Sequence, residues 1–167
     1  SPASAAVDGN TGTRWSSAFS DPQWLQVDLG SAQSICQVVL NWETASGKAY
    51  QIQTSNDGTT WSSVYSTTAG PGGVETLNIT GSGRYIRMYG TARNTAYGYS
   101  LWEFQVFGTA TGGTGGCNTG TNLALNKTAT TSSTENAGTP ASAAFDGNTG
   151  TRWSSAASDP QWLQVDL

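Results

Sequence analysis

The chain has 167 residues, of which 11% are charged, and its 7 basic and 11 acidic residues give a net charge of −4. No basic patch stands out, which argues against nucleic acid and anionic membrane surfaces as partners. The chain contains no histidine, so Ser-His catalysis, Cys-His catalysis and histidine-ligated zinc are excluded. These features indicate a folded, weakly charged protein without histidine-based acid–base chemistry.

Residues 6–15 are too polar and too rich in glycine for a helix or a central strand, and they predict a structured loop. Asp8, Asn10 and Thr13 recur at short spacing within it, separated by glycines. Glycine lets the backbone curl so that side-chain and carbonyl oxygens converge, which suits a hard cation such as calcium. A loop closed by Asx-turns without a metal fits the same spacing, so the residues alone leave both interpretations open.

The strand pattern begins after this loop. Residues 22–29 alternate between polar or aromatic residues such as Trp24 and apolar residues such as Leu25, and this period of two predicts a β-strand. We expect a turn at residues 30–31. Further strands are predicted at residues 35–42, 50–55, 61–67, 74–79, 85–89 and 101–107. No helical period of useful length occurs, so the pattern predicts an all-β sandwich or jelly roll.

The remaining third of the chain predicts a second unit. Residues 109–121 are rich in glycine and threonine and predict a flexible linker. Residues 2–29 recur at residues 140–167 with two differences, which indicates tandem duplication. We predict a domain at residues 1–108 that lacks its own first strand, followed by the start of a second repeat at residues 122–167. The head of that repeat should supply the missing strand, either by folding back or by joining a neighbouring chain, because unpaired edge strands are costly.

Two cysteines, Cys36 and Cys117, predict a disulfide if the protein is secreted. The sequence leaves their pairing open, because each cysteine could also bond a neighbouring repeat. A catalytic thiol is not expected, since the chain offers no histidine partner.

Seven motifs together resemble the discoidin domain, also called the coagulation factor V/VIII type C domain. They are NLALNK, AVDGNTGTRWSS, PQWLQVDLG, VVLNWE, YQIQTSNDGTTW, RYIRMYG and AYGYSLWEFQVFG. Bacterial members of this family form carbohydrate-binding module family 32, and the sequence is most similar to the modules of bacterial chitosanases and β-glucanases. The resemblance covers nearly the whole chain outside the linker, and it implies an eight-stranded antiparallel β-sandwich jelly roll.

The resemblance also implies one structural Ca²⁺ beside the ligand face. Its implied ligands are Asp8, Asn10, Thr13, Glu103 and the backbone carbonyls of Ala5 and Trp102. All of these ligands offer oxygen, as calcium prefers. The ion is expected to be structural rather than catalytic, because no base or nucleophile lies with it.

Sugar binding is implied at the loops of one end of the sandwich. Aromatic faces would contact the C–H side of a pyranose ring, and planar polar groups would bind its hydroxyls. The candidate ligand-binding residues are Arg14, Phe19, Trp24, Glu43, Tyr97, Tyr99 and Glu135. Two carboxylates near the sugar, Glu43 and Glu135, favour an aminosugar cation over a neutral glucan.

We therefore expect a secreted, extracellular, non-catalytic module that binds a polysaccharide such as chitosan or β-glucan. The alternative is a structural or adhesive tandem-repeat protein that assembles with copies of itself, head to tail, into an extracellular filament. Hydrolysis is the weakest hypothesis, because Glu43 and Glu135 lie in loops without the signature of a deep cleft. Membrane binding is not expected, because the seven basic residues are scattered along the chain.

Overall fold

The computed structural model describes residues 1–110, 116–117 and 119–131 and confirms the all-β fold class. Its elements are the 3₁₀ helix η1 (Ser4–Ala6) and the strands β1 (Trp15–Ser16), β2 (Gln23–Trp42), β3 (Gly47–Ser55), β4 (Ser62–Thr67), β5 (Val74–Arg93), β6 (Ser100–Ala110) and β7 (Thr128–Thr131). Every strand pairing is antiparallel. Within these described ranges, no helix has the length and apolar character needed to cross a membrane.

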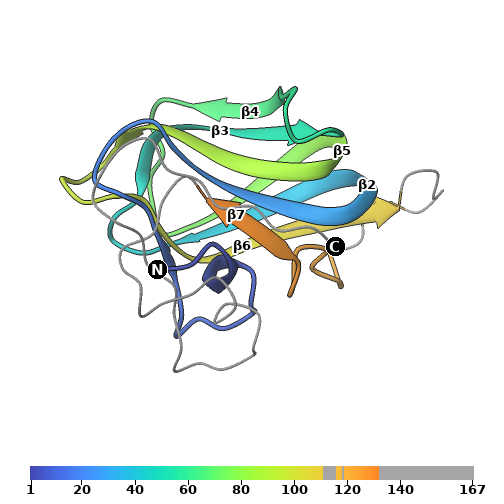
Figure 1. Cartoon of the computed structure of the whole chain (residues 1–167), viewed down its shortest axis with the longest axis horizontal. Helices are drawn as coiled ribbons and strands as arrows, with labels where there is room; N and C mark the ends of the chain where they lie inside the picture. The colour runs from blue at the N-terminus through green and yellow to red at the C-terminus, as the bar shows by residue number, and fades with distance from the viewer. Residues whose placement is uncertain (111–115, 118, 132–167) are drawn as a thin grey trace.

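The strands form two layers, and the long strands β2 and β5 each run through both layers (Figure 1). The first half of β2 pairs with the second half of β5 and with β7, and β3 and β4 continue this layer beyond β5. The second half of β2 pairs with β6 and with the first half of β5, and the short β1 lies beside β6. If each half of β2 and of β5 is counted as a segment, one layer has five segments and the other has three, with β1 as an extension. This agrees with the predicted eight-stranded sandwich.

The turn predicted at residues 30–31 is wrong, because β2 bends there without ending. Gly30 has a φ of 83°, and the register shifts between Asp28 and Gln33, so the strand curves from one layer into the other. Gly83 lies at the matching bend of β5, where a Cβ atom would stand 2.7 Å from the carbonyl oxygen of Ser55. The two glycines therefore let both strands wrap the same end of the sandwich.

The alternation along β2 places its apolar residues in the core between the layers. Leu25 and Val27 have no exposed surface, whereas their neighbour Trp24 is partly exposed. Trp15 and Phe104 are also completely buried and fill the middle of the core. Burial of such side chains contributes about 1.5–3 kcal/mol each, so this core holds the layers together.

The segment after the linker supplies a strand to the sandwich of residues 1–110. β7 pairs with β2, and the buried Ala129 on β7 joins the core. Leu123 donates its N–H to the carbonyl of Val106 at 2.7 Å, which ties the start of this segment to β6. Exchange of this strand between neighbouring copies stays a prediction, and residues 132–167 of the predicted second repeat lie outside the described residues.

Cys36 and Cys117 form a disulfide within the chain, with their Cα atoms 5.6 Å apart. The bond joins β2 to a point 81 residues further along the sequence. Of the two pairings that the sequence left open, the structure therefore shows the internal one. The bond fixes the end of the linker against the sandwich, just before the segment that provides β7.

Candidate functional site

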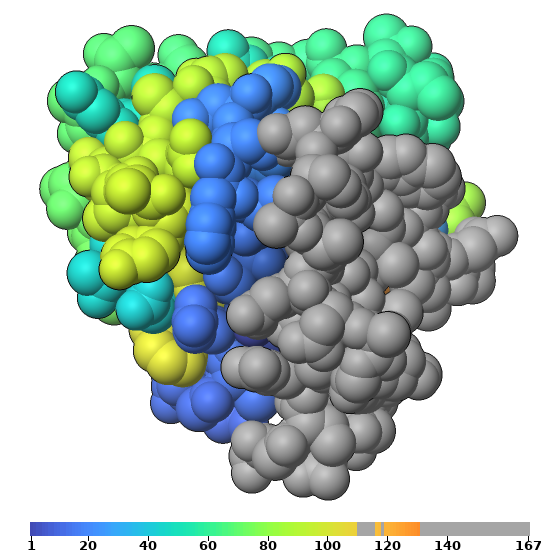
Figure 2. All heavy atoms as spheres, turned by 60° about the vertical axis from the view of Figure 1, so that its left-hand side comes forward, coloured from blue at the N-terminus to red at the C-terminus, as the bar shows by residue number. Residues whose placement is uncertain are grey.

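Three loops meet at the end of the sandwich where β2 begins and ends, opposite the bends of β2 and β5. Hydrogen bonds join the loops: Ser17 N–H to Tyr99 carbonyl at 2.6 Å, Ser100 N–H to Ala45 carbonyl at 2.8 Å, and Asn94 N–H to Ser46 carbonyl at 3.0 Å. Figure 2 looks towards this end, where the blue segment before β2 lies beside the yellow-green segment between β5 and β6. We call this end, formed by residues 17–22, 43–46 and 94–99, the rim.

Phe19 and Tyr97 form an exposed aromatic pair on the rim. Their ring centroids are 6.0 Å apart at an interplanar angle of 76°, so the rings meet edge to face. Phe19 is 62% exposed and Tyr97 is 65% exposed, which is unusual for rings of this size. Two apolar ring surfaces held apart from the core are suited to contact a ligand that has apolar faces of its own.

Arg14 and Glu43 form a charged pair next to these loops. The Nη1 atom of Arg14 lies 3.8 Å from Oε2 of Glu43 and donates to Oγ of Ser100 at 2.5 Å. Oε2 of Glu43 also accepts the N–H of Ala45 at 3.0 Å. Partial burial acts to raise the pKa of Glu43, but the Ala45 hydrogen bond and the charge of Arg14 together lower it below its ordinary value. Glu43 therefore carries a negative charge at neutral pH.

Tyr99, one of the predicted ligand-binding residues, is completely buried, so its ring lies in the core. Its hydroxyl donates a very short hydrogen bond to Oδ1 of Asp21, and burial followed by that bond raises the pKa of Tyr99. The other oxygen of Asp21 accepts from Nε of Arg93 at 2.9 Å, and Nη1 of Arg93 donates to the carbonyl of Tyr97 at 3.2 Å. Asp21 and Arg93, which the sequence reasoning missed, thus link Tyr99 to the backbone of Tyr97.

The two remaining ligand candidates lie elsewhere. Trp24 is on the outer face of the five-stranded layer, where its ring lies 5.9 Å from the guanidinium of Arg87 on β5. Glu135 lies outside the described residues. The structure therefore brings Arg14, Phe19, Glu43 and Tyr97 to the rim loops and the segment beside them.

The predicted calcium loop is closed by its own hydrogen bonds. Oδ2 of Asp8 accepts from Oγ1 of Thr13 at 2.6 Å, and Oδ1 of Asp8 accepts the N–H of Asn10 at 2.9 Å. Gly9 has a φ of 75°, a conformation that glycine adopts without strain. The loop thus gathers a carboxylate, an amide and a hydroxyl within a few residues, as the Asx-turn interpretation and the calcium interpretation both require.

The calcium interpretation also involves Glu103, which lies beside Asp8. This residue on β6 is 2% exposed, and neither of its carboxylate oxygens has a hydrogen-bond partner. Burial and the neighbouring carboxylate of Asp8 raise the pKa of Glu103 to about 8. A buried carboxylate beside a partly buried one is costly unless one of them is protonated or a cation lies between them, and the oxygen donors present would fit Ca²⁺. No group of three His, Cys, Asp or Glu residues occurs in the described ranges, so amide, hydroxyl and carbonyl oxygens would complete the shell.

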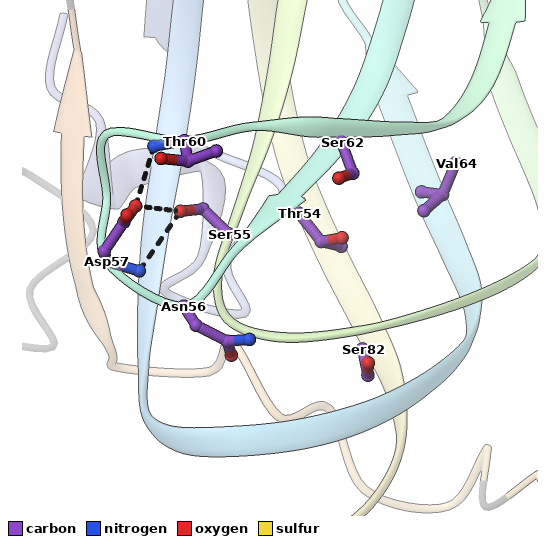
Figure 3. Close-up of a pocket in the computed structure, with 8 residues that line it drawn as sticks. All are labelled: Thr54, Ser55, Asn56, Asp57, Thr60, Ser62, Val64 and Ser82. Carbon is purple, nitrogen blue, oxygen red and sulfur yellow. Dashed lines mark hydrogen bonds between the residues drawn. The ribbon is translucent and has the colours of Figure 1, made fainter.

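An open pocket of about 540 Å³ lies at the other end of the sandwich, between the β3–β4 loop and the bend of β5 (Figure 3). Its polar side chains bond one another. Oγ of Ser55 donates to Oδ1 of Asp57 at 2.9 Å, and Oδ1 of Asp57 also accepts the N–H of Thr60 at 2.7 Å. Hydrogen bonds from Thr60 and Thr59 hold the pKa of Asp57 well below its usual range. These contacts shape the turn, and none of the predicted ligand residues lines the pocket.

Solved structures similar to this chain include two chitosan-binding modules from the chitosanase/glucanase of Paenibacillus sp. IK-5. Module 1 is 50% identical with a TM-score of 0.61, and the match covers 64% of this chain and 84% of the module. Module 2, solved in complex with chitotriose, is 49% identical with a TM-score of 0.61, over 64% of this chain and 86% of that one. The similarity supports the jelly-roll fold described above.

A curated relative, the polysaccharide lyase 8 family protein HylA of Enterococcus faecalis, is 42% identical over 71 residues. That match covers 42% of this chain and 5% of HylA, so the chain spans a small part of this relative. A family model described as a NedA-like, galactose-binding domain of the F5/8 type C group matches residues 5–88, and the model of the F5/8 type C domain itself matches residues 128–167. The chain therefore belongs to the F5/8 type C, or discoidin, family and to its carbohydrate-binding module branch, family 32.

Proposed function

We propose that the rim binds chitosan, or a closely related β-linked polysaccharide, and that the module holds a larger secreted protein on this substrate. The observation that carries the proposal is the exposed Phe19–Tyr97 pair, in rim loops that hydrogen bonds join to the loop of Glu43. The aromatic rings offer apolar faces for the C–H side of sugar rings. The similarity to chitosan-binding modules, including one with bound chitotriose, points to the same polysaccharide class.

Glu43 gives the rim its preference for an amino sugar. Its lowered pKa keeps the carboxylate ionised at neutral pH, so it can attract the ammonium group of glucosamine. Arg14 holds the carboxylate in place and donates to neighbouring oxygens. A neutral glucan would make the aromatic contacts but not this charge interaction, so we expect weaker binding of β-glucan.

The module is proposed to be non-catalytic. Glycoside hydrolysis requires a carboxylic acid with a raised pKa that can protonate the leaving oxygen. Glu43 has a lowered pKa instead, and the carboxylate with a raised pKa, Glu103, is buried on β6 away from solvent. Polysaccharide cleavage would thus depend on another part of the full-length protein.

A structural Ca²⁺ and an extracellular location complete the proposal. When bound, the ion would offset the negative charges of the partly buried Asp8 and the buried Glu103, and the loop oxygens of Asn10 and Thr13 would also bind it. The ion would hold the loop that leads directly into Arg14. The Cys36–Cys117 disulfide supports export, because such bonds persist in oxidising compartments.

Calorimetric titration with chitotriose tests the proposal. Wild-type protein should bind chitotriose more tightly than laminaritriose, and Tyr97→Ala should weaken chitotriose binding roughly tenfold, or by about 1.4 kcal/mol. Tyr97→Phe is the matched control and should bind nearly as well, because it keeps the exposed ring. Glu43→Gln should remove most of the preference for chitotriose. Equal binding of the two sugars by the wild type would contradict the charge argument, and no binding of either would refute the proposed function.

A further inference from the structure

An arginine lies among three aromatic rings on the outer face of the five-stranded layer. Arg87 on β5 pairs in register with Gln26 on β2 and Gln53 on β3, so it stands near the middle of this layer. Figure 1 shows β5 between β2 and β3. Its guanidinium carbon lies 4.0 Å from the ring centroid of Trp61, 5.0 Å from that of Tyr89 and 5.9 Å from that of Trp24. We call Arg87 and these three rings the Arg87 platform. None of its members is needed for the rim.

The platform is partly open to solvent. Arg87, Trp24, Trp61 and Tyr89 are each partly exposed, although they lie on a sheet whose other face is the core. Contact between a guanidinium and an aromatic face is favourable, and it holds the arginine in one orientation at low entropic cost. Burial lowers the pKa of Arg87 to about 10, which leaves it fully charged at neutral pH. The rings therefore present a fixed positive charge on an aromatic surface.

The hydrogen bonds of Arg87 leave its outer edge free. Its Nε donates to Oε1 of Gln53 at 2.7 Å, and Nε2 of Gln53 donates to Oε1 of Gln51 at 2.7 Å. Among the described residues, neither Nη atom of Arg87 has a protein acceptor and no carboxylate pairs with it. The nearby Arg84 differs, since its guanidinium makes two bonds to the carboxylate of Asp28. In the described part of the chain, Arg87 therefore has no carboxylate partner for its charge.

We propose that the Arg87 platform is a second glycan site, separate from the rim, that binds a sugar bearing a carboxylate. Two parallel N–H donors at the edge of a guanidinium match the two oxygens of a carboxylate. The flanking rings of Trp61 and Tyr89, both partly exposed, provide apolar surface for the sugar ring itself. Charge complementarity selects a uronic acid unit, because a protonated amino sugar would be repelled by Arg87. The two sites therefore prefer opposite charges: an amino sugar at the rim and a uronate at the platform.

Titration with trigalacturonate tests this site in the protein as it exists. Wild-type protein should bind trigalacturonate saturably in 20 mM NaCl and several-fold more weakly in 150 mM NaCl, and it should bind neutral galactotriose at least tenfold more weakly. Arg87→Gln should reduce trigalacturonate binding at least tenfold and Arg87→Lys by a smaller factor, because lysine keeps the charge but loses the paired donors. Both variants should bind chitotriose as the wild type does. Tyr97→Ala is the reverse control and should leave trigalacturonate binding unchanged.

Each result decides the proposal. Absence of saturable trigalacturonate binding to the wild type would overturn it, as would equal binding of galactotriose or unchanged binding by Arg87→Gln. If Arg87→Gln unfolds, as thermal denaturation would reveal, Trp61→Ala takes its place and should weaken trigalacturonate binding severalfold. Wild-type binding of trigalacturonate that Trp61→Ala leaves unaltered would also overturn the platform. Chitotriose binding is a separate readout, so failure of the rim proposal would be recognised independently.

Discussion

Replacement of Glu103 by glutamine should raise the stability of the metal-free protein and lower the stability of the calcium-loaded protein. Glu103 is buried beside Asp8, and its two oxygens have no hydrogen-bond partner. In the metal-free protein, ionisation of Glu103 places a second negative charge in this buried site. With calcium bound, the same charge would be attractive. Glu103→Gln keeps the shape of the side chain and removes the charge, so it should stabilise the metal-free protein and destabilise the calcium-loaded one.

The size of the effect follows from the raised pKa. Against an ordinary value of 4.5, a pKa of about 8 means that the folded protein holds this proton more tightly than the unfolded chain does. The contribution of this proton to the free energy of unfolding is therefore fully present below about pH 4.5, and it is lost as the pH rises through about 8. At about 1.36 kcal/mol per pH unit, the total loss in the metal-free protein is up to roughly 5 kcal/mol, a large fraction of the stability of an ordinary domain.

Thermal unfolding at pH 5, 7 and 9, in EDTA and in millimolar CaCl₂, would measure this effect. In EDTA the wild type should lose stability between pH 5 and pH 9, and calcium should restore it, by about 2.7 kcal/mol when its concentration is 100 times the Kd. The stability of Glu103→Gln should depend little on pH or on calcium. The variant should therefore be more stable than the wild type in EDTA at pH 9 and less stable than the wild type in CaCl₂. A wild-type melting temperature that does not respond to EDTA at pH 9 would refute the calcium site, and a pH-independent one in EDTA would refute the carboxylate pairing.

Three further predictions concern the scaffold. Cys36→Ser should lower the free energy of unfolding by at most about 4.5 kcal/mol, because the disulfide closes a loop of 81 residues, and urea denaturation with and without reductant should give the same loss. Tyr99→Phe should cost about 1–2 kcal/mol in the same assay, because it leaves an oxygen of Asp21 without its buried donor, and a smaller loss than for an exposed tyrosine would contradict the geometry. Gly9→Ala should cost roughly 1–2 kcal/mol, because φ is +75° and the new Cβ would stand 2.9 Å from Cδ1 of Leu125; unchanged stability would show that the segment before β7 yields readily.

The alternation of side chains allowed the fold to be predicted, but not its continuity. Residues 24–29 alternate with a period of two, and the structure buries Leu25, Val27 and Leu29 as that pattern requires, although Gln26 and Asp28 on the other face are buried too. The same pattern could not show that β2 continues past Gly30, because a glycine in a polar stretch signals a turn and a bend equally well. Pairing with β5 on both sides of Gly30 makes this site a bend rather than a turn. That pairing joins residues far apart in sequence, so the local pattern could not reveal it.

The rim could be predicted only in part for a related reason. Tyr97 and Tyr99 flank one glycine in the sequence, and nothing local tells which ring faces solvent. The structure turns Tyr99 inward because Gly98 packs against the backbone of residues 17–18, where a Cβ would stand 2.4 Å from the carbonyl oxygen of Ser17. Arg87 was missed because its partners come from three different elements and converge only in the folded sheet.

The position of Tyr97 shows why burial of its neighbour matters for binding. An exposed loop residue loses conformational freedom when it binds a sugar, and that loss weakens affinity. Here Tyr99 is anchored in the core, Asp21 accepts from Tyr99, and Arg93 joins Asp21 to the carbonyl of Tyr97. The chain of contacts orders the loop before any ligand arrives. Asp21→Asn should therefore weaken chitotriose binding while keeping the rings of Phe19 and Tyr97, and an unchanged affinity would show that the loop orders only on binding.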